Sequence, residues 1–276
     1  MGKYNEFDIR MKNYENVSRN YLNKKEPVII RIDMKAGHSF TKGLTKPFDS
    51  IFSITMQDTL ITLCNNIQGC KFGYTQSDEI SLLLTDFDNE DTVGWFDYNI
   101  NKLVSVSASM ATLYFNKNFQ DNVEEYLFYA SKEYDIRDLI EKEKILNSKI
   151  NTALFDSRAF NLPIDEVTNY FIWRQNDGMR NSIQSFARSF YSTKQMQNLS
   201  CKELIEKIII EKDIDWNNLA ESLKYGASCK RKSNLSGRMK FKIYNDTPIF
   251  SKNREYIEEI FKDNDIRNKI ENNLSI

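Results

Sequence analysis

The stretch Val28-Ile29-Ile30-Arg31-Ile32-Asp33 combines a run of β-branched residues with a carboxylate at its end. Such a run predicts a buried β-strand, which holds Asp33 at a fixed position where the strand stops. A second acid, Asp78, lies between the runs Lys71–Tyr74 and Ile80–Leu84, which together predict a hairpin. Two carboxylates at neighbouring strand ends can hold two Mg²⁺ ions, and such sites support phosphoryl or nucleotidyl transfer.

The segments around these strands predict an α+β fold. A helix is expected over Thr55–Ile67, whose apolar residues recur at helical spacing, and a longer helix over Trp95–Phe115. Ala153-Leu154-Phe155 is expected to add a short strand. The order strand, helix, hairpin, helix and strand is that of a ferredoxin-like βαββαβ core, in which helices cover one face of an antiparallel sheet.

Further helices are predicted around this core. Asp8–Lys25 has the apolar spacing of an amphipathic helix, and the charged segment Asp135–Lys149 predicts a surface helix or a mobile insertion. After Pro163, which the first turn of a helix tolerates, helices are expected over Ile164–Trp173 and Gly178–Tyr191.

The C-terminal part of the chain predicts a helical and β-hairpin extension. Leu204–Ile210 and Trp216–Tyr225 are expected to be helical, and Ala227–Lys232 is expected to pair with Met239–Tyr244. We therefore expect a catalytic domain over residues 1–191, including the N-terminal helix, and an extension over residues 192–276, with a soft boundary between them.

The composition narrows the functional classes. The 276 residues carry a net charge of −1, so any binding of nucleic acid has to come from a local basic patch. No apolar stretch approaches the roughly 20 residues that span a bilayer, and the first residues lack the apolar core of a signal peptide. Four cysteines without CxxC spacing and one histidine argue against a zinc site. We therefore expect a cytoplasmic protein without membrane contact.

A third acid, Glu79, lies beside Asp78 at the hairpin tip. If the hairpin is adjacent to the strand of Asp33, three carboxylates converge there. Like charges so close together are unfavourable without a cation, and Mg²⁺ is the natural compensation. A solvated acidic turn is the alternative that the pattern alone leaves open.

Candidate phosphate-binding residues lie near the acids. Lys42 and Lys46 are in the loop after the first strand and Lys102 is on the long helix, and lysine offers a compact positive charge to a triphosphate. Ser77 can donate to a phosphate oxygen, while His38 is a candidate ligand, nucleotide contact or ordinary polar residue. A solvated surface position is the alternative for each lysine. No P-loop or Rossmann glycine motif is present.

A second polar cluster lies in the segment that leads into the last predicted helix of the catalytic domain. Arg158, Arg174 and Asp177 are compatible with a helix junction held by ion pairs or with a ligand site. Arg180 and Asn181, at the start of the next expected helix, are better placed to meet a ligand.

The densest basic patch belongs to the C-terminal hairpin. Its members are Lys230, Arg231, Lys232, Arg238, Lys240 and Lys242. Contact with a polyanion is one interpretation of this patch, and a solvated basic hairpin is the other.

Four motifs, in order along the chain, resemble a known family. They are Arg31-Ile32-Asp33, the segment Gly73–Ser81 with its Ser-Asp-Glu turn, Phe155-Asp156-Ser157-Arg158, and Trp173–Asp177 followed by Asn181. From about Ile29 to Ser192 the chain is similar to the tRNA-histidine guanylyltransferase family and its relatives, the Thg1-like proteins. The Ser-Asp-Glu turn and the Trp-Arg-Gln-x-Asp block together make the resemblance specific.

The resemblance implies a polymerase-type palm that adds nucleotides to the 5′ end of tRNA in the 3′–5′ direction. It implies that Asp33, Asp78 and the backbone carbonyl of Met34 bind two Mg²⁺ ions, with Glu79 beside them as a further catalytic residue. ATP, GTP and other nucleoside triphosphates are the implied substrates, through a 5′-adenylylated RNA. Assembly into a homotetramer belongs to the same expectation.

The resemblance also suggests which residues contact nucleotide. Positions linked to triphosphate handling or nucleotide transfer match Lys46, Ser77, Lys102 and Asn181. Asp49 matches a position near the incoming base, and we add His38 to this nucleotide set. The residues expected to contact RNA are Arg180, Lys230, Arg231, Lys232 and Arg238.

The chain departs from the family pattern at several positions. Met34 replaces the glycine that usually follows the first aspartate, so it supplies the carbonyl without the backbone freedom of glycine. Gly37 stands where an aromatic residue is usual, which predicts a looser wall beside His38. Phe48 and Asn99 replace an asparagine and an arginine of the eukaryotic members.

One departure concerns the kind of reaction. Gly178-Met179-Arg180-Asn181 replaces the His-Ile-Asn block that is tied to the addition of an extra guanosine to histidine tRNA. The chain is therefore expected to be nearest to the Thg1-like proteins, which act in template-dependent 5′-end repair. A nucleotide cyclase or second-messenger enzyme on the same palm, or a catalytically impaired RNA-binding homologue, are the alternatives.

Overall fold

An antiparallel sheet of six strands, in the order β4-β1-β3-β2-β5-β6, forms the centre of the molecule. The computed structural model describes residues 5–87, 89, 91–131, 136–233 and 239–262. The order β4-β1-β3-β2, with β1 antiparallel to both of its neighbours, confirms the predicted α+β, ferredoxin-like core. The strands are β1 (Val28–Met34), β2 (Cys70–Gln76), β3 (Glu79–Leu84), β4 (Phe155–Asn161), β5 (Ala227–Ser233) and β6 (Met239–Tyr244).

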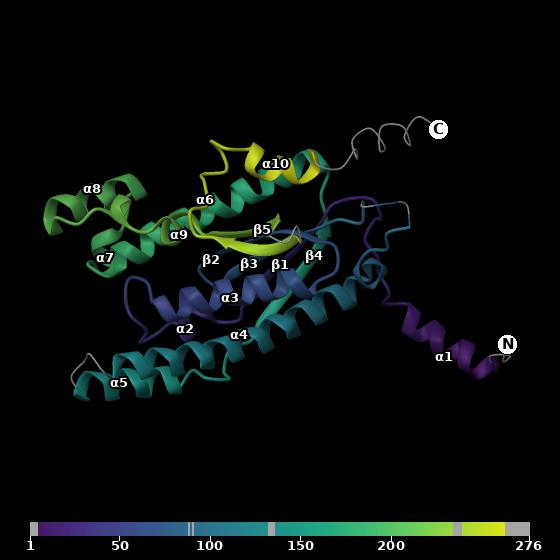
Figure 1. Ribbon diagram of the computed structural model, residues 1–276, viewed down its shortest axis with the longest axis horizontal. Coiled ribbons are helices and arrows are strands. Elements are labelled where there is room, and N and C mark those ends of the chain that lie inside the picture. Colours follow the sequence, from purple (N-terminus) through teal and green to yellow (C-terminus); the bar gives the residue numbers. More distant parts are fainter. Residues whose placement is uncertain (1–4, 88, 90, 132–135, 234–238, 263–276) are drawn as a thin grey trace.

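Helices cover both faces of this sheet (Figure 1). α3 (Ser50–Asn66) and α4 (Ile100–Ala130) connect β1 to β2 and β3 to β4, and they pack on one face as predicted. α6 (Ile164–Arg188) and α10 (Glu255–Lys262) cover the opposite face, so the prediction of helices on one face only is incomplete. Because side chains alternate along a strand, the central strands supply apolar residues to both cores.

Both helices of the first face begin at a capping side chain. Asp49 accepts the amide of Phe52 at 3.1 Å, so α3 begins earlier than predicted. Asn99 accepts the amide of Lys102 at 3.0 Å at the start of α4. The predicted start of this helix at the tryptophan of η1 (Trp95–Tyr98) is wrong, because the last three residues of η1 have φ angles of 51°, 53° and 57°. Such left-handed angles do not belong to an α-helix.

The second face depends on one unbroken helix. The predicted pair of helices with an interruption before Gly178 is wrong, since α6 runs through this residue without a break. A Cβ atom on Gly178 would lie 2.3 Å from Cγ of Gln76 at the end of β2. The glycine therefore permits a close approach of the helix to the sheet rather than ending the helix.

Of the two peripheral helices, the N-terminal one is shorter than predicted and the one in the charged segment forms as predicted. α1 (Glu6–Asn16) extends away from the sheet (Figure 1), and none of its side chains is buried. The predicted amphipathic helix over Asp8–Lys25 is therefore too long, and its apolar stripe meets no core within the described chain. The charged segment forms α5 (Ile136–Asn147), a surface helix that lies along α4 and buries Leu146.

The C-terminal hairpin enlarges the central sheet, because β5 pairs with β2. The predicted domain boundary near residue 191 stays a prediction. Within the described ranges, no helix is both long enough and apolar enough to cross a membrane. Short helices between α6 and β5 close a small apolar core together with the end of α6. They are α7 (Thr193–Met196), α8 (Cys201–Lys212), η2 (Trp216–Asn218) and α9 (Glu221–Tyr225).

Candidate active site

Two of the predicted acids lie together at the end of β1. Asp33 is the penultimate residue of that strand, and Asp78 lies in the two-residue turn that joins β2 to β3. The amide of Met34 donates to the carbonyl of Asp78 at 3.1 Å, which fastens the turn to the end of β1. Ser77, the first residue of the turn, has a left-handed φ of 56°. The hairpin tip therefore lies beside Asp33.

In the acid pair, Asp33 and Asp78, the environment of Asp33 disfavours its charged form. Burial raises the pKa of Asp33, and the negative charges of Asp78 and Asp156 raise this pKa further, while Arg31 and Arg158 act against the shift. Asp156 is the residue of β4 directly opposite Asp33. Within the described residues, neither member of the acid pair forms a salt bridge. Among these residues, neither carboxylate of the pair thus has a cation in direct contact.

A magnesium ion fits the chemistry of the acid pair. Mg²⁺ usually binds one or two carboxylates and takes its remaining ligands from water and substrate phosphates. Asp33 and Asp78 supply that number of carboxylates. The described part of the chain contains no group of three or more His, Cys, Asp or Glu side chains that could hold a metal ion. The side chain of Met34 is buried in the core, and its carbonyl as a further ligand stays a prediction.

Gly37, the first residue of α2 (Gly37–Phe40), makes room for one of these acids. A Cβ atom on Gly37 would lie 1.8 Å from Oδ2 of Asp78 and 2.8 Å from its Cγ. The carboxylate of Asp78 thus fills the space that any larger residue would need. The looser wall predicted beside His38 is therefore wrong, because the acid itself occupies this space.

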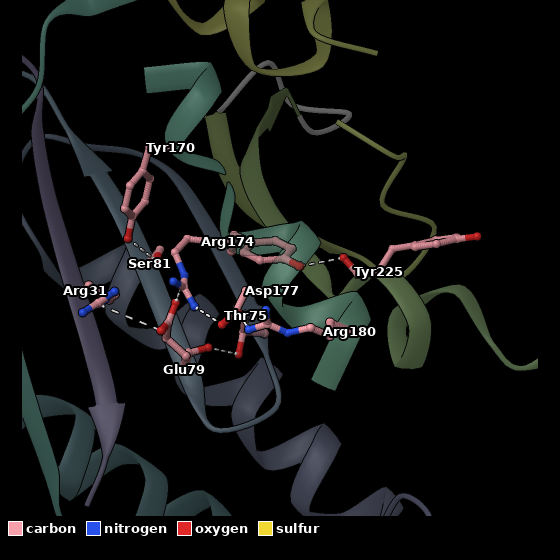
Figure 2. Close-up of polar contacts among 10 residues, drawn as sticks. Arg31, Thr75, Glu79, Ser81, Tyr170, Arg174, Asp177, Arg180 and Tyr225 are labelled. Carbon is pink, nitrogen blue, oxygen red and sulfur yellow. Dashed lines mark hydrogen bonds and ion pairs between the residues drawn. The ribbon is translucent and has the colours of Figure 1, made fainter. Parts of the chain in front are cut away.

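Glu79 is held by arginines rather than left with the acid pair (Figure 2). Its Oε1 accepts a hydrogen bond from Nε of Arg174 at 2.8 Å, and Nε of Arg31 lies 4.0 Å from its Oε2. Burial raises the pKa of Glu79, and both arginines act against that rise. Figure 2 shows Glu79 between Arg31 of β1 and Arg174 of α6. This carboxylate already has its cations, and a direct catalytic role for it stays a prediction.

A pocket lies beyond the end of β2, between α3, the loop over residues 41–49 and the second half of α6. Phe48, Phe52, Met56 and Leu223 give it apolar walls, which suit the face of a nucleobase. Five of the predicted nucleotide contacts line it: His38, Lys46, Asp49, Ser77 and Asn181.

Asp49 differs from the other lining residues. Its two carboxylate oxygens accept the amides of Thr45 at 3.0 Å and Phe52 at 3.1 Å, and the residue is 6% exposed. Asp49 therefore shapes the loop and caps α3. A contact with the incoming base stays a prediction for this residue.

Two helical faces contribute pocket residues that the sequence reasoning missed. On α6, Ser185 and Arg188 follow Asn181 after four and seven residues, and all three line the pocket. On α3, Gln57 follows Asp49 after eight residues and lines the opposite side. Residues at these spacings share one face of a helix. Counting along each helix from Asn181 and Asp49 would have identified them.

Lys102 lies outside this pocket. It is exposed in the first turn of α4, with Nζ 5.7 Å from the ring centroid of Phe96. α4 reaches the level of the acid pair ten residues later, where Thr112 accepts the amide of Phe155 at 3.1 Å. Ten helical residues span about 15 Å. The structure therefore does not bring Lys102 to the acid pair within one chain, and its contact with a triphosphate stays a prediction.

The predicted RNA contacts differ in their surroundings. Arg180 is exposed, and its guanidinium pairs with Asp177. Arg231 is exposed on β5, with its guanidinium carbon 5.2 Å from the ring centroid of Phe241. Arg238 lies outside the described residues.

The lysines of the C-terminal hairpin share one face of the sheet. Lys230 is opposite Lys242, and Lys232 is opposite Lys240. Like charges directly opposite each other are unfavourable unless an anion compensates them. Nζ of Lys230 lies 3.7 Å from the ring centroid of Tyr256, so the other three lysines are the exposed ones.

Known proteins share this fold and part of this sequence. The family model described as tRNAHis guanylyltransferase matches residues 8–163. A bacterial tRNAHis guanylyltransferase (Thg1)-like protein solved with ATP is 39% identical, covers 92% of this chain and 99% of its own, and gives a TM-score of 0.78. A structure of such a bacterial protein with GTP is 37% identical over 93% of this chain and 99% of its own, with a TM-score of 0.73. An uncharacterized protein of Acanthamoeba polyphaga mimivirus is 27% identical over 267 residues, 92% of this chain and 87% of its own.

Proposed function

The chain belongs to the tRNAHis guanylyltransferase family, and on this premise we propose that this nucleotidyltransferase is a Mg²⁺-dependent 3′–5′ polymerase that repairs the 5′ end of tRNA. One observation carries the proposal. The acid pair Asp33 and Asp78, which forms no salt bridge within the described chain, lies at the strand ends beside a pocket lined by Lys46, Ser77 and Asn181.

Within this proposal the side chains have distinct roles. When bound, two Mg²⁺ ions held by Asp33, Asp78 and the carbonyl of Met34 would neutralise the triphosphate and activate the attacking oxygen. Lys46 would pair with phosphate oxygens, and Asn181 would donate hydrogen bonds to them. The apolar walls of the pocket would exclude water from the base.

The proposed reaction has two balanced steps. A 5′-monophosphate oxygen of the RNA attacks the α-phosphorus of ATP, and pyrophosphate leaves. The 3′-hydroxyl of an incoming nucleoside triphosphate then attacks the adenylylated 5′-phosphate, its proton passes to water, and AMP leaves. Pairing of the incoming base with the facing RNA strand selects the nucleotide. Structures of bacterial Thg1-like proteins with ATP and with GTP support both as ligands of such a site.

A direct assay tests this function. The purified protein is incubated with Mg²⁺, ATP, all four nucleoside triphosphates and a labelled 5′-monophosphate tRNA that lacks its first nucleotides. We expect extension until the 5′ end is fully paired. Intact histidine tRNA is the matched substrate control, and a preference for one untemplated guanosine on it would overturn the repair assignment. Cyclic products from nucleoside triphosphates alone would support the cyclase alternative instead.

Contacts with RNA and the assembly are parts of the same proposal. We expect Arg180 and the hairpin lysines to bind phosphates, so Lys232→Ala should reduce the salt slope of RNA binding by roughly 1. Tyr14 on α1 and Val17, which directly follows this helix, are 71% and 84% exposed, which favours burial against another copy. Light scattering should give the mass of a homotetramer of 32.5 kDa chains. A cytoplasmic location is expected of a protein that acts on tRNA.

A further inference from the structure

Contacts at regular helical spacing fasten α6 to the β2–β3 hairpin (Figure 2). The hydroxyls of Tyr170 and Ser81 lie 2.8 Å apart in the middle of β3. Four residues along the helix, Nε of Arg174 donates to Oε1 of Glu79 at 2.8 Å, at the first residue of β3. Residues four apart share one face of a helix, so these contacts follow one stripe of α6 along β3.

The same stripe continues past the turn of the hairpin. Gly178 lies four residues after Arg174 on α6, and its carbonyl accepts a hydrogen bond from Nε2 of Gln76 at 3.3 Å. Gln76 is the residue of β2 that pairs with Glu79 of β3. A side chain on Gly178 would collide with Gln76. The following turn of α6 presents Asn181 to the pocket, which Ser77 also lines.

The charged contact of this stripe is held from several sides. Nη2 of Arg174 donates to Oδ2 of Asp177 at 2.7 Å, and its guanidinium carbon lies 4.3 Å from the ring centroid of Trp173. The side chain of Arg174 is 10% exposed. Because the planar guanidinium of Arg174 donates to both Glu79 and Asp177, its orientation is fixed. Nε of Arg31 lies 4.0 Å from the other carboxylate oxygen of Glu79. Glu79 is therefore not free to turn toward Asp33.

We propose that the ion pair between Arg174 and Glu79 is a positioning contact that sets the register of α6 on the hairpin. The register determines how far Asn181 lies from Asp78, and hence how one nucleoside triphosphate reaches both. Glu79 then acts through Arg174 and not as a metal ligand or proton carrier. The inference rests on the proposed function, because that function assigns Asn181 to the nucleotide and Asp78 to the metal end of one site.

A double-mutant cycle tests the positioning role. Glu79→Ala, Arg174→Ala and the double variant are compared for ATP affinity by calorimetry in Mg²⁺ and for the rate of nucleotide addition. We expect each single variant to lose about tenfold in ATP affinity, and the double variant to lose no more than either. If the losses of ATP affinity in the two single variants multiplied in the double variant, the proposal would be overturned. Such independence is expected if Glu79 binds the metal, because a metal ligand acts without Arg174.

Glu79→Gln separates positioning from catalysis. Its amide oxygen still accepts the hydrogen bond of Arg174, but the group neither carries the charge of a metal ligand nor transfers a proton. We expect a rate within about tenfold of wild type and an unchanged Mg²⁺ concentration for half-maximal activity. A loss as deep as that of Asp78→Ala would show that Glu79 acts on the reacting groups directly.

Gly178→Ala tests the register without removing a charge. The added methyl group should push α6 away from Gln76 and weaken ATP binding by a similar factor, with an unchanged circular dichroism spectrum. Unchanged ATP affinity in this variant would contradict the proposal. Lys202→Ala, which removes an exposed ion pair with Glu206 on α8, is the control and should bind ATP like wild type. ATP binding is measured without RNA, so a failure of 5′-end repair and a failure of the positioning role are distinguishable.

Discussion

Two groups of charged side chains lie at the same end of the sheet and differ in how their charge is balanced. The acid pair Asp33 and Asp78 has no salt bridge within the described chain, whereas the neighbouring Glu79 lies between Arg31 and Arg174. The charge of Glu79 is balanced by side chains of the protein itself, whereas the acid pair needs a bound cation to balance its charge. Uncompensated charge therefore indicates where a ligand binds, and compensated charge indicates what holds the binding site in shape.

The largest expected effect comes from removing the uncompensated acids. Asp33→Ala and Asp78→Ala should each lower the rate of nucleotide addition by about 1,000-fold or more, because the charge that holds the metal ions is lost. The rate is measured with labelled, truncated tRNA under single-turnover conditions. The circular dichroism spectrum should match that of wild type. Near wild-type turnover of either variant in Mg²⁺ would disprove the assignment of the acid pair.

Breaking the compensated group should act on stability. Arg174→Ala leaves the buried carboxylate of Glu79 without its nearest cation and should lower the free energy of unfolding by about 3–5 kcal/mol. The measurement is urea unfolding at pH 7. Lys202→Ala on α8, which removes an exposed ion pair with Glu206, is the control, with an expected change below about 1 kcal/mol. If both variants lost equally little, the arginine would not be compensating a buried charge.

The third prediction concerns Lys46, a positively charged residue of the pocket that has no assigned partner in the proposed site other than the nucleotide. Lys46 lines the pocket, is exposed and should pair with a phosphate, so Lys46→Ala should raise the KM for ATP about tenfold. Lys202→Ala removes a similarly exposed lysine on α8, far along the chain, and should leave this KM unchanged. Equal KM values for the two variants would remove Lys46 from the nucleotide site.

The smallest effect concerns the burial of Asp33 and the repulsion from the acids around it. Since the pKa of Asp33 is raised in the folded state, the folded protein binds this proton more tightly than the unfolded chain does. Stability therefore falls as the pH rises from 3.8, the ordinary value, through the raised pKa. In metal-free buffer, Asp33→Asn should raise the free energy of unfolding at pH 7 by about 0.2–1 kcal/mol. The difference in unfolding free energy between Asp33→Asn and wild type should vanish below pH 3.8. If Asp33→Asn were instead less stable than wild type at pH 7, the carboxylate of Asp33 would have a stabilising partner.

The sequence predicted those parts of the molecule that local patterns encode. The β-branched run before Asp33 and the polar turn at Asp78 were sufficient for the first strand, the hairpin and the ferredoxin-like order of elements. The partner of Glu79 was not predictable in this way, because Arg174 is 95 residues away and an ion pair over such a separation leaves no periodic signal. The continuity of α6 was missed because Gly178 looks like a helix end until its contact with Gln76 is known.

Apolar spacing alone was also insufficient for the N-terminal helix. The stripe that includes Met11, Tyr14 and Val17 predicted packing against a core, yet these side chains are exposed in the single chain. A pattern of this kind reports that a helix has an apolar face and does not report what covers it.

The space shared by Gly37 and Asp78 has a consequence for the engineering of this chain. A Cβ atom on Gly37 would lie 1.8 Å from Oδ2 of Asp78, so any larger residue at position 37 requires the Asp78 carboxylate to turn away from its present place. Position 37 is therefore a handle on the orientation of this acid, through which a designer can change its rotamer without removing either carboxylate of the pair.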